Sequence, residues 1–149
     1  MVQSSRTVPW RWRWLAPAFV WFAAVAVYSS SLNNGLLAYD DRMHLVRNPY
    51  MNPPTTAGLA RMWQGPFWGE YVPVTYTVWW IQARLALLSD RTEIDPRVFH
   101  FTNVALHAAT AVVVWAVLRR LTFSLTAATL ATLLFAIHPL QTEAVAWVS

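Results

Sequence analysis

Three long blocks of apolar residues stand out along the chain, and polar or charged stretches separate them. The blocks cover about residues 14–31, 98–118 and 121–138, and none of them contains Asp, Glu, Lys or Arg. A helix needs about 20 predominantly apolar residues to cross the hydrocarbon core of a bilayer. In lipid, only a helix satisfies all of its backbone groups within one segment. The pattern therefore predicts three transmembrane helices.

A more polar segment, about residues 32–97, lies between the first and second blocks. It holds all four glycines and most of the prolines, which predicts irregular but shaped structure. Within it, residues 71–83 are apolar but too few to span a bilayer. This part predicts a helix lying at the membrane interface, with the apolar residues Trp79, Trp80, Ile81, Leu85 and Leu88. The predicted fold is thus an all-α membrane protein with three transmembrane helices, a long outer loop carrying an interfacial helix, and an outer segment at 139–149.

The arginines predict how these helices are oriented. Arg6, Arg11 and Arg13 precede the first block, and Arg119 and Arg120 follow the second. Cytoplasmic flanks of transmembrane helices carry the excess of positive charge. Both clusters therefore predict a cytoplasmic N-terminus and an outer or luminal location for the long loop and the C-terminal segment. The first block has an alternative interpretation as the apolar region of a cleaved signal peptide.

Composition excludes several classes of protein. Hydrophobic residues make up 56% of the chain and charged residues 12%, against about 45–50% and about 25% in soluble domains. The net charge of +4 comes from arginines at the ends of apolar blocks, whereas a nucleic-acid binder gathers basic residues on one face. The chain has no cysteine, so disulfides, thiolate chemistry and cysteine-bound zinc are excluded.

Two polar clusters are candidates for chemistry at the outer ends of the predicted helices. Asp40 and Asp41 follow the first helix, where adjacent carboxylates suit a general base or a cation site. His138 and Glu143 lie at the outer mouth of the third helix, and titratable groups at such a position suggest function. Either cluster could instead be a solvated helix end. The predicted topology places both at the same outer level, where they could line one cavity.

The second predicted helix carries a polar stripe formed by His100, Asn103 and His107. Offsets of three and seven residues place these side chains on one helical face. Such a stripe normally faces the interior of a helix bundle. It could contact a substrate or form hydrogen bonds between helices. The histidine spacing matches no recognised metal motif, so it predicts no metal site, and a need for a divalent cation stays open.

The order of several short motifs resembles a known family. The motifs are Tyr39-Asp40-Asp41, Asn48-Pro49, Phe67-Trp68-Gly69, Val72-Pro73-Val74-Thr75, Phe99-His100-Phe101-Thr102-Asn103, His107, Leu134-Phe135-Ala136-Ile137-His138-Pro139 and Glu143-Ala144-Val145-Ala146-Trp147-Val148-Ser149. Together they resemble the start of the membrane O-mannosyltransferase-like proteins of the transmembrane and tetratricopeptide-repeat type and their bacterial relatives. These proteins have a GT-C glycosyltransferase fold.

The resemblance implies transfer of mannose or a similar sugar from a polyprenyl-phosphate donor to a hydroxyl of a protein or glycan acceptor. The reaction would take place on the periplasmic, extracellular or luminal face of the cell membrane. By this resemblance, Asp40 corresponds to the acid that activates the acceptor, with Asp41 as its neighbour. His138 and Glu143 correspond to a second outer-loop motif beside the active site. Arg97 is one of several loop arginines that could bind the phosphate of the donor.

Enzymes of this family have many more transmembrane helices, and often a soluble repeat domain as well. Residues 1–149 are therefore expected to form the N-terminal part of a GT-C domain and to be inactive alone. The alternatives are a non-enzymatic multi-pass protein, such as a transporter or an assembly subunit, and an inactive remnant. Transporters place their binding groups near the bilayer midplane. The outer location predicted for the acidic groups favours the enzyme.

Overall fold

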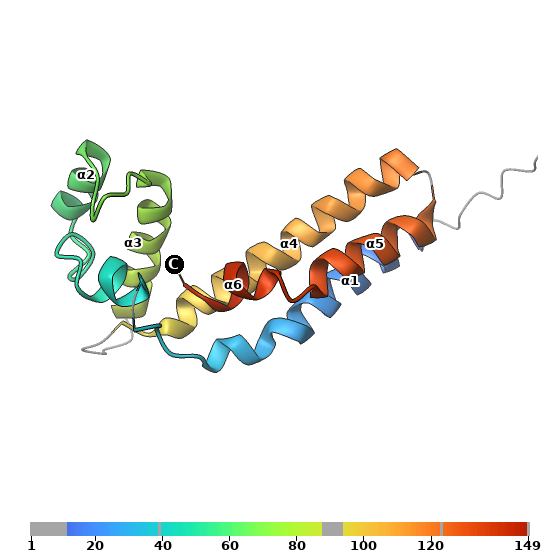
Figure 1. Cartoon of the computed structure of the whole chain (residues 1–149), viewed down its shortest axis with the longest axis horizontal. Coiled ribbons are helices and arrows are strands. Elements are labelled where there is room, and N and C mark those ends of the chain that lie inside the picture. The colour runs from blue at the N-terminus through green and yellow to red at the C-terminus, as the bar shows by residue number, and fades with distance from the viewer. Residues whose placement is uncertain (1–11, 39, 88–93, 123, 149) are drawn as a thin grey trace, which may run out of the picture. The chain divides into compact units, whose positions relative to one another are not determined.

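The computed structural model describes residues 12–38, 40–87, 94–122 and 124–148. Helices account for nearly all of the regular structure in these ranges (Figure 1), which confirms the all-α prediction. The helical elements are α1 (Trp12–Tyr28), η1 (Ser29–Asn33), η2 (Arg42–Val46), α2 (Thr56–Gln64), α3 (Pro73–Leu87), α4 (Pro96–Thr122), α5 (Leu125–Ile137) and α6 (Gln141–Ala146). The chain divides into two compact units. We call Met1–Ser29 with Val104–Thr142 the helical unit, and Ser30–Asn103 with Glu143–Ser149 the loop unit.

Small side chains hold the helical unit together. Its core contains Val20 and Ala24 of α1, Ala108, Ala111 and Trp115 of α4, and Ala128 and Ala136 of α5. Alanines let helix backbones approach closely, as is common between helices in membranes. Hydrogen bonds supplement this packing, because the Trp115 indole N–H donates to the hydroxyl of Thr129 over 3.1 Å. The unit is thus a three-helix assembly with a narrow, alanine-rich core.

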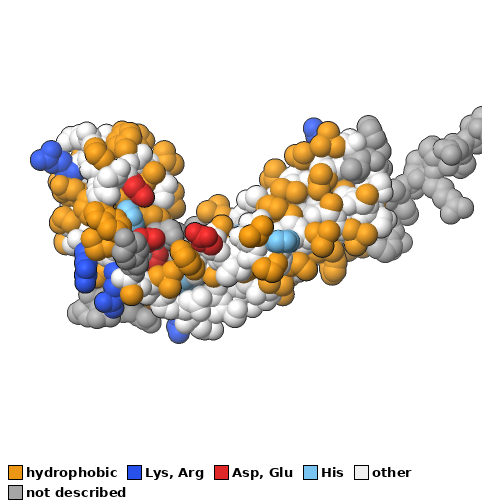
Figure 2. Space-filling view, viewed as in Figure 1, with side chains coloured by type: hydrophobic (Ala, Val, Ile, Leu, Met, Phe, Trp, Pro, Cys, Tyr) orange, Lys and Arg blue, Asp and Glu red, His pale blue; other side chains and the backbone are white. Residues whose placement is uncertain are grey.

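Two helical segments of the described chain are long and apolar enough to cross a membrane. They are Trp14–Asn33 and Pro96–Leu121, and in each only 22% of the most apolar window is buried within the chain. A core helix of a soluble protein would be mostly buried, so this exposure favours contact with lipid. Exposed apolar side chains are also abundant on the visible surface (Figure 2). These features support association with a membrane.

The prediction of a third transmembrane helix at 121–138 is wrong. Its first residues, Leu121 and Thr122, complete α4, and α5 has only 13 residues. At about 1.5 Å per residue α5 is about 20 Å long, short of a hydrocarbon core of about 30 Å. The helix begins after Ser124, whose hydroxyl accepts from the N–H of Ala127. It ends at Ile137 because His138 has an extended backbone before Pro139, as residues preceding proline commonly do.

The loop unit packs short helices around large side chains. Leu45, Met51, Met62, Tyr76 and Phe99 are almost fully buried in its core. At one close contact, the Cα of Gly58 lies against the backbone of residue 50, where a Cβ would clash. This compact core is consistent with the prediction that the loop is irregular but structured.

Helix α3 corresponds to the predicted interfacial segment, but its exposed face differs from the predicted residues. Val74, Val78, Ile81 and Leu85 are exposed, and their spacings of four, three and four residues put them on one face. We call these four residues the α3 stripe. Trp79 and Trp80 instead pack against the core of the loop unit, and the Trp80 indole N–H donates to the carbonyl of Thr55. Leu88 lies outside the described residues, as do Arg6 and Arg11 and the side chain of Arg13.

Candidate functional site

Asp40 and Asp41 follow the first span and have different environments. The Asp41 side chain is fully buried, and its Oδ2 accepts from the N–H of Leu37 over 2.8 Å. This bond ties Asp41 to the chain segment before it. Asp40 is only half-buried. Tyr39, the first residue of the Tyr-Asp-Asp motif, lies outside the described residues. Of the two carboxylates, Asp40 is thus the one with access to an external hydroxyl.

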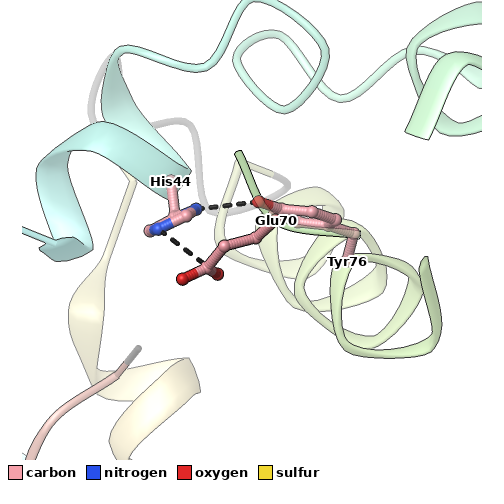
Figure 3. A network of polar contacts seen from close by, with 3 residues as sticks. All are labelled: His44, Glu70 and Tyr76. Carbon is pink, nitrogen blue, oxygen red and sulfur yellow. Dashed lines mark hydrogen bonds and ion pairs between the residues drawn. The ribbon is translucent and has the colours of Figure 1, made fainter. Parts of the chain in front are cut away.

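Three polar residues that sequence reasoning did not select form a connected network in the loop unit. His44, Glu70 and Tyr76 lie next to one another, and His44 is in the middle (Figure 3). The Tyr76 hydroxyl and the His44 Nδ1 are 2.8 Å apart, and the His44 Nε2 lies 3.9 Å from Oε2 of Glu70. His44 and Tyr76 are almost fully buried, whereas 61% of the Glu70 side chain is exposed. The network therefore leads from the surface into the core.

Aromatic rings enclose the imidazole of His44. Phe67, Trp68, Tyr76 and Trp79 all have ring centroids within 6.3 Å of the imidazole. Burial raises the pKa of Tyr76 to about 12, and the negative charge of Glu70 adds to this effect. The phenol therefore stays protonated at neutral pH and can donate its proton to Nδ1. In that tautomer, the N–H of His44 is on Nε2, the nitrogen that faces Glu70.

A two-residue turn carries Glu70 over the histidine. Phe67 and Glu70 exchange two backbone hydrogen bonds of 2.9 and 3.0 Å. Between them, Trp68 and Gly69 have φ angles of 49° and 88°. Positive φ at both central positions defines the type I′ turn of tight hairpins. Gly69 adopts this conformation without strain, whereas a bulky residue such as Trp68 rarely does.

The three members of the polar stripe on α4 make different contacts. The Asn103 side-chain amide donates to the carbonyl of Trp147 over 2.6 Å. The His107 Nε2 lies 2.8 Å from the carbonyl of Ala136 in α5. The His107 contact joins α4 to α5, whereas the Asn103 contact joins α4 to the residue that follows α6. His100 is fully buried, and neither ring nitrogen has a hydrogen-bond partner in the part of the chain that the structure describes.

The remaining predicted site residues are exposed. The His138 Nδ1 accepts from the N–H of Leu140, and its carbonyl accepts from the hydroxyl of Tyr28 over 3.1 Å. Glu143 lies in the first turn of α6, and Arg97 in the first turn of α4. Within the described ranges, no group of three or more His, Asp or Glu side chains is arranged to hold a metal ion.

Sequence reasoning missed the network around His44 because its members are far apart along the chain. His44 and Tyr76 are separated by 32 residues, and no local spacing pattern connects them. One local signal did exist. Gly69, within an aromatic stretch and next to Glu70, is typical of a tight turn. That signal predicts the turn but not which residue lies beneath it.

The chain is similar to two known proteins of the same name. In an alignment of 130 residues that covers 80% of the chain, it is 31% identical to Protein O-mannosyl-transferase TMTC3 of Mus musculus. It is 30% identical over 130 residues to the protein of the same name from Homo sapiens. The chain spans 13% of the length of each of these relatives. No family model matches the chain, and no solved structure matches it. The similarity supports a distant relationship to these O-mannosyl-transferases.

Proposed function

We propose that the chain forms part of a membrane glycosyltransferase. The enzyme transfers mannose or a similar hexose from a polyprenyl-phosphate donor to an acceptor hydroxyl on the outer or luminal face. The observation that carries this proposal is the 31% identity to a protein named as an O-mannosyl-transferase, which extends over 80% of the chain. The two membrane-length apolar helices are in keeping with a donor that resides in the membrane.

In this proposal, Asp40 is the general base. Asp41 is buried and already accepts a backbone hydrogen bond, so it holds the segment in place while Asp40 faces the acceptor. Asp40 takes the proton of the acceptor hydroxyl as the acceptor oxygen bonds to the anomeric carbon of the sugar. The bond from that carbon to the phosphate oxygen breaks, and its electron pair leaves with the phosphate.

The departing phosphate requires positive charge or hydrogen-bond donors nearby. Arg97 is exposed at the start of α4, and a guanidinium suits a phosphate because it forms two parallel hydrogen bonds. We assign this role to Arg97. His138 and Glu143, both exposed, complete the proposed substrate-binding residues. His100 joins them because it is buried and its ring nitrogens have no hydrogen-bond partner among the described residues, so they retain the capacity to bind a polar group.

The α3 stripe is proposed to lie on the outer surface of the bilayer. It belongs to the loop unit, which is connected along the chain to both membrane-length segments. Four exposed aliphatic side chains on one helical face are typical of an interfacial helix. Because the chain has no cysteine, single cysteines can be introduced at Val78 in the stripe and at the exposed Thr75 outside it. A fluorophore at position 78 should be quenched by brominated lipid, and one at position 75 should not. Equal quenching at both positions would contradict the proposed orientation.

Orientation across the membrane has a separate test. A reporter fused after Arg120 should lie in the cytoplasm, and one inserted in the exposed loop at Gly35 should lie outside. A cytoplasmic location for the loop reporter would contradict the outer location of every proposed site residue.

The activity is tested by sugar transfer in the complete protein. Membranes containing it should transfer mannose from a polyprenyl-phosphate mannose donor to hydroxyl-bearing peptides. Replacing Asp40 with Asn preserves shape but removes the base, and should lower turnover by about 10²–10⁴-fold. The amount of folded protein should stay the same, because Asp40 is only half-buried. Undiminished turnover of Asp40→Asn would remove it as the base, and no transfer by the unaltered protein would refute the proposed function.

A further inference from the structure

We propose that the turn from Phe67 to Glu70 is a saccharide-binding subsite. The indole of Trp68 is the surface on which the sugar ring stacks, and the Glu70 carboxylate accepts hydrogen bonds from sugar hydroxyls. This inference rests on the proposed function for its choice of ligand class, because a glycosyltransferase must hold a sugar or a glycan. Its physical basis is independent and lies in the geometry of the turn.

The first observation is the strain at Trp68. Its φ of 49° lies in the left-handed region, where glycine and asparagine are favoured and where a bulky residue is strained. An interaction made by the indole side chain would explain why tryptophan occupies this unfavourable backbone conformation. The indole lies beside the imidazole of His44, with ring centroids 5.5 Å apart, and 47% of the residue is exposed. Trp68 therefore still presents apolar surface to solvent.

The second observation is the position of Glu70 within the same turn. Its side chain is 61% exposed, and a carboxylate can accept several hydrogen bonds at once. His44 lies 3.9 Å from one of its oxygens, which restricts the carboxylate without using its full capacity. An exposed indole and an exposed carboxylate on one tight turn match the two sides of a pyranose. Such a ring has an apolar C–H face and a rim of hydroxyl donors.

The third observation is that hydrogen bonds hold both the turn and the histidine beneath it. Two backbone hydrogen bonds close the turn. Beneath it, Tyr76 holds the imidazole of His44 through a contact of 2.8 Å (Figure 3). Rigid groups lose little conformational entropy on binding, which favours affinity for a small ligand. The negative charge of Glu70 also disfavours the phosphate of a lipid headgroup at this position, so a neutral sugar is the better match.

The test is binding of methyl α-D-mannopyranoside to the whole chain in detergent, measured by saturation-transfer NMR. The main variant is Trp68→Asn, because asparagine tolerates the left-handed region and preserves the turn without the ring. Loss of stacking worth about 0.5–1.5 kcal/mol corresponds to an affinity about twofold to twelvefold lower. Glu70→Gln keeps the shape and loses the charge-assisted hydrogen bond, which should weaken binding about fivefold. Trp147→Ala is the matched control, since Trp147 is comparably exposed at 39%.

Weakened binding in both turn variants with an unchanged Trp147→Ala control would support the subsite. The inference is overturned if the unaltered chain binds no mannoside, or if Trp68→Asn binds it equally well. It is also overturned if Trp68→Asn reduces only quenching by brominated lipid, since Trp68 would then be a membrane anchor. Circular dichroism shows whether each variant is folded. If Trp68→Asn does not fold, the isosteric Glu70→Gln variant still tests the subsite. Sugar transfer without an effect of these variants on binding would refute the subsite and leave the proposed function intact.

Discussion

Replacing Tyr76 with Phe gives a sharp test of the network around His44. The substitution removes one hydroxyl from a side chain that is 1% exposed, and it leaves the ring in place. The lost hydroxyl lies 2.8 Å from the His44 Nδ1, so this buried nitrogen is left without its partner. An unsatisfied buried polar group destabilises a protein by about 1–3 kcal/mol. For a chain of this size, that corresponds to a melting temperature about 2–10 °C lower.

The assay is thermal unfolding in detergent, followed by circular dichroism. Tyr71→Phe is the matched control, because the Tyr71 hydroxyl also makes a hydrogen bond, to the carbonyl of Trp63, but the residue is 56% exposed. Water can replace that bond, so the control should change little. His44→Leu alone should also destabilise the chain, and the double variant with Tyr76→Phe should lose less than the sum of the single losses. Strictly additive losses, or equal effects of Tyr76→Phe and Tyr71→Phe, would refute the buried hydrogen bond.

Three further predictions concern the loop unit. Asp41→Asn should lower stability by about 1–3 kcal/mol in thermal unfolding, because its buried carboxylate accepts a backbone hydrogen bond; an unchanged melting temperature would contradict this structural role. Gly58→Ala should sharply reduce the yield of folded protein, since the new Cβ would lie 2.9 Å from two backbone atoms of Tyr50. Gly35→Ala has open space around it and should leave the yield unchanged. Finally, the pKa of Tyr76 is about 12 in the folded chain, against an ordinary value of 10. As the pH rises, the unfolded chain therefore loses this proton before the folded chain does. The free energy of unfolding should thus fall as the pH rises from about 10 to 12. Tyr76→Phe should remove that part of the pH dependence in alkaline unfolding curves, and an unchanged curve would contradict the assignment.

The amino-acid sequence was sufficient to predict the helical class and two membrane-length helices. Apolar blocks without charges are a local property, and their length can be compared directly with the thickness of a bilayer. The same reasoning wrongly predicted a third transmembrane helix at residues 121–138. A block without charged residues shows where a helix could lie in lipid, but it does not show where one helix ends and the next begins. Leu121 belongs to α4, and α5 ends before Pro139. Local backbone chemistry divided one apolar block between two helices.

Only the tertiary structure distinguished the residues of the candidate site. Adjacency in the sequence suggested that Asp40 and Asp41 act together, yet the structure buries Asp41, with a hydrogen bond from Leu37, and leaves Asp40 half-buried. For the α4 stripe, the helical period predicted a shared face but not the contacts, and Asn103 and His107 proved to bond to backbone carbonyls. The helical period determines only the direction in which a side chain points from the helix axis. What a side chain meets in that direction depends on segments elsewhere in the chain.

The network of His44, Glu70 and Tyr76 shows this dependence most clearly. Its three residues come from η2, the turn before α3 and α3 itself, and no sequence motif joins them. Hydrophobic packing of the loop unit brings them together, because Tyr76 is part of the core and the turn folds back over it. Sequence patterns report contacts between near neighbours. Contacts across more than thirty residues exist only once the core has formed, because burial of side chains distant in the sequence sets their positions.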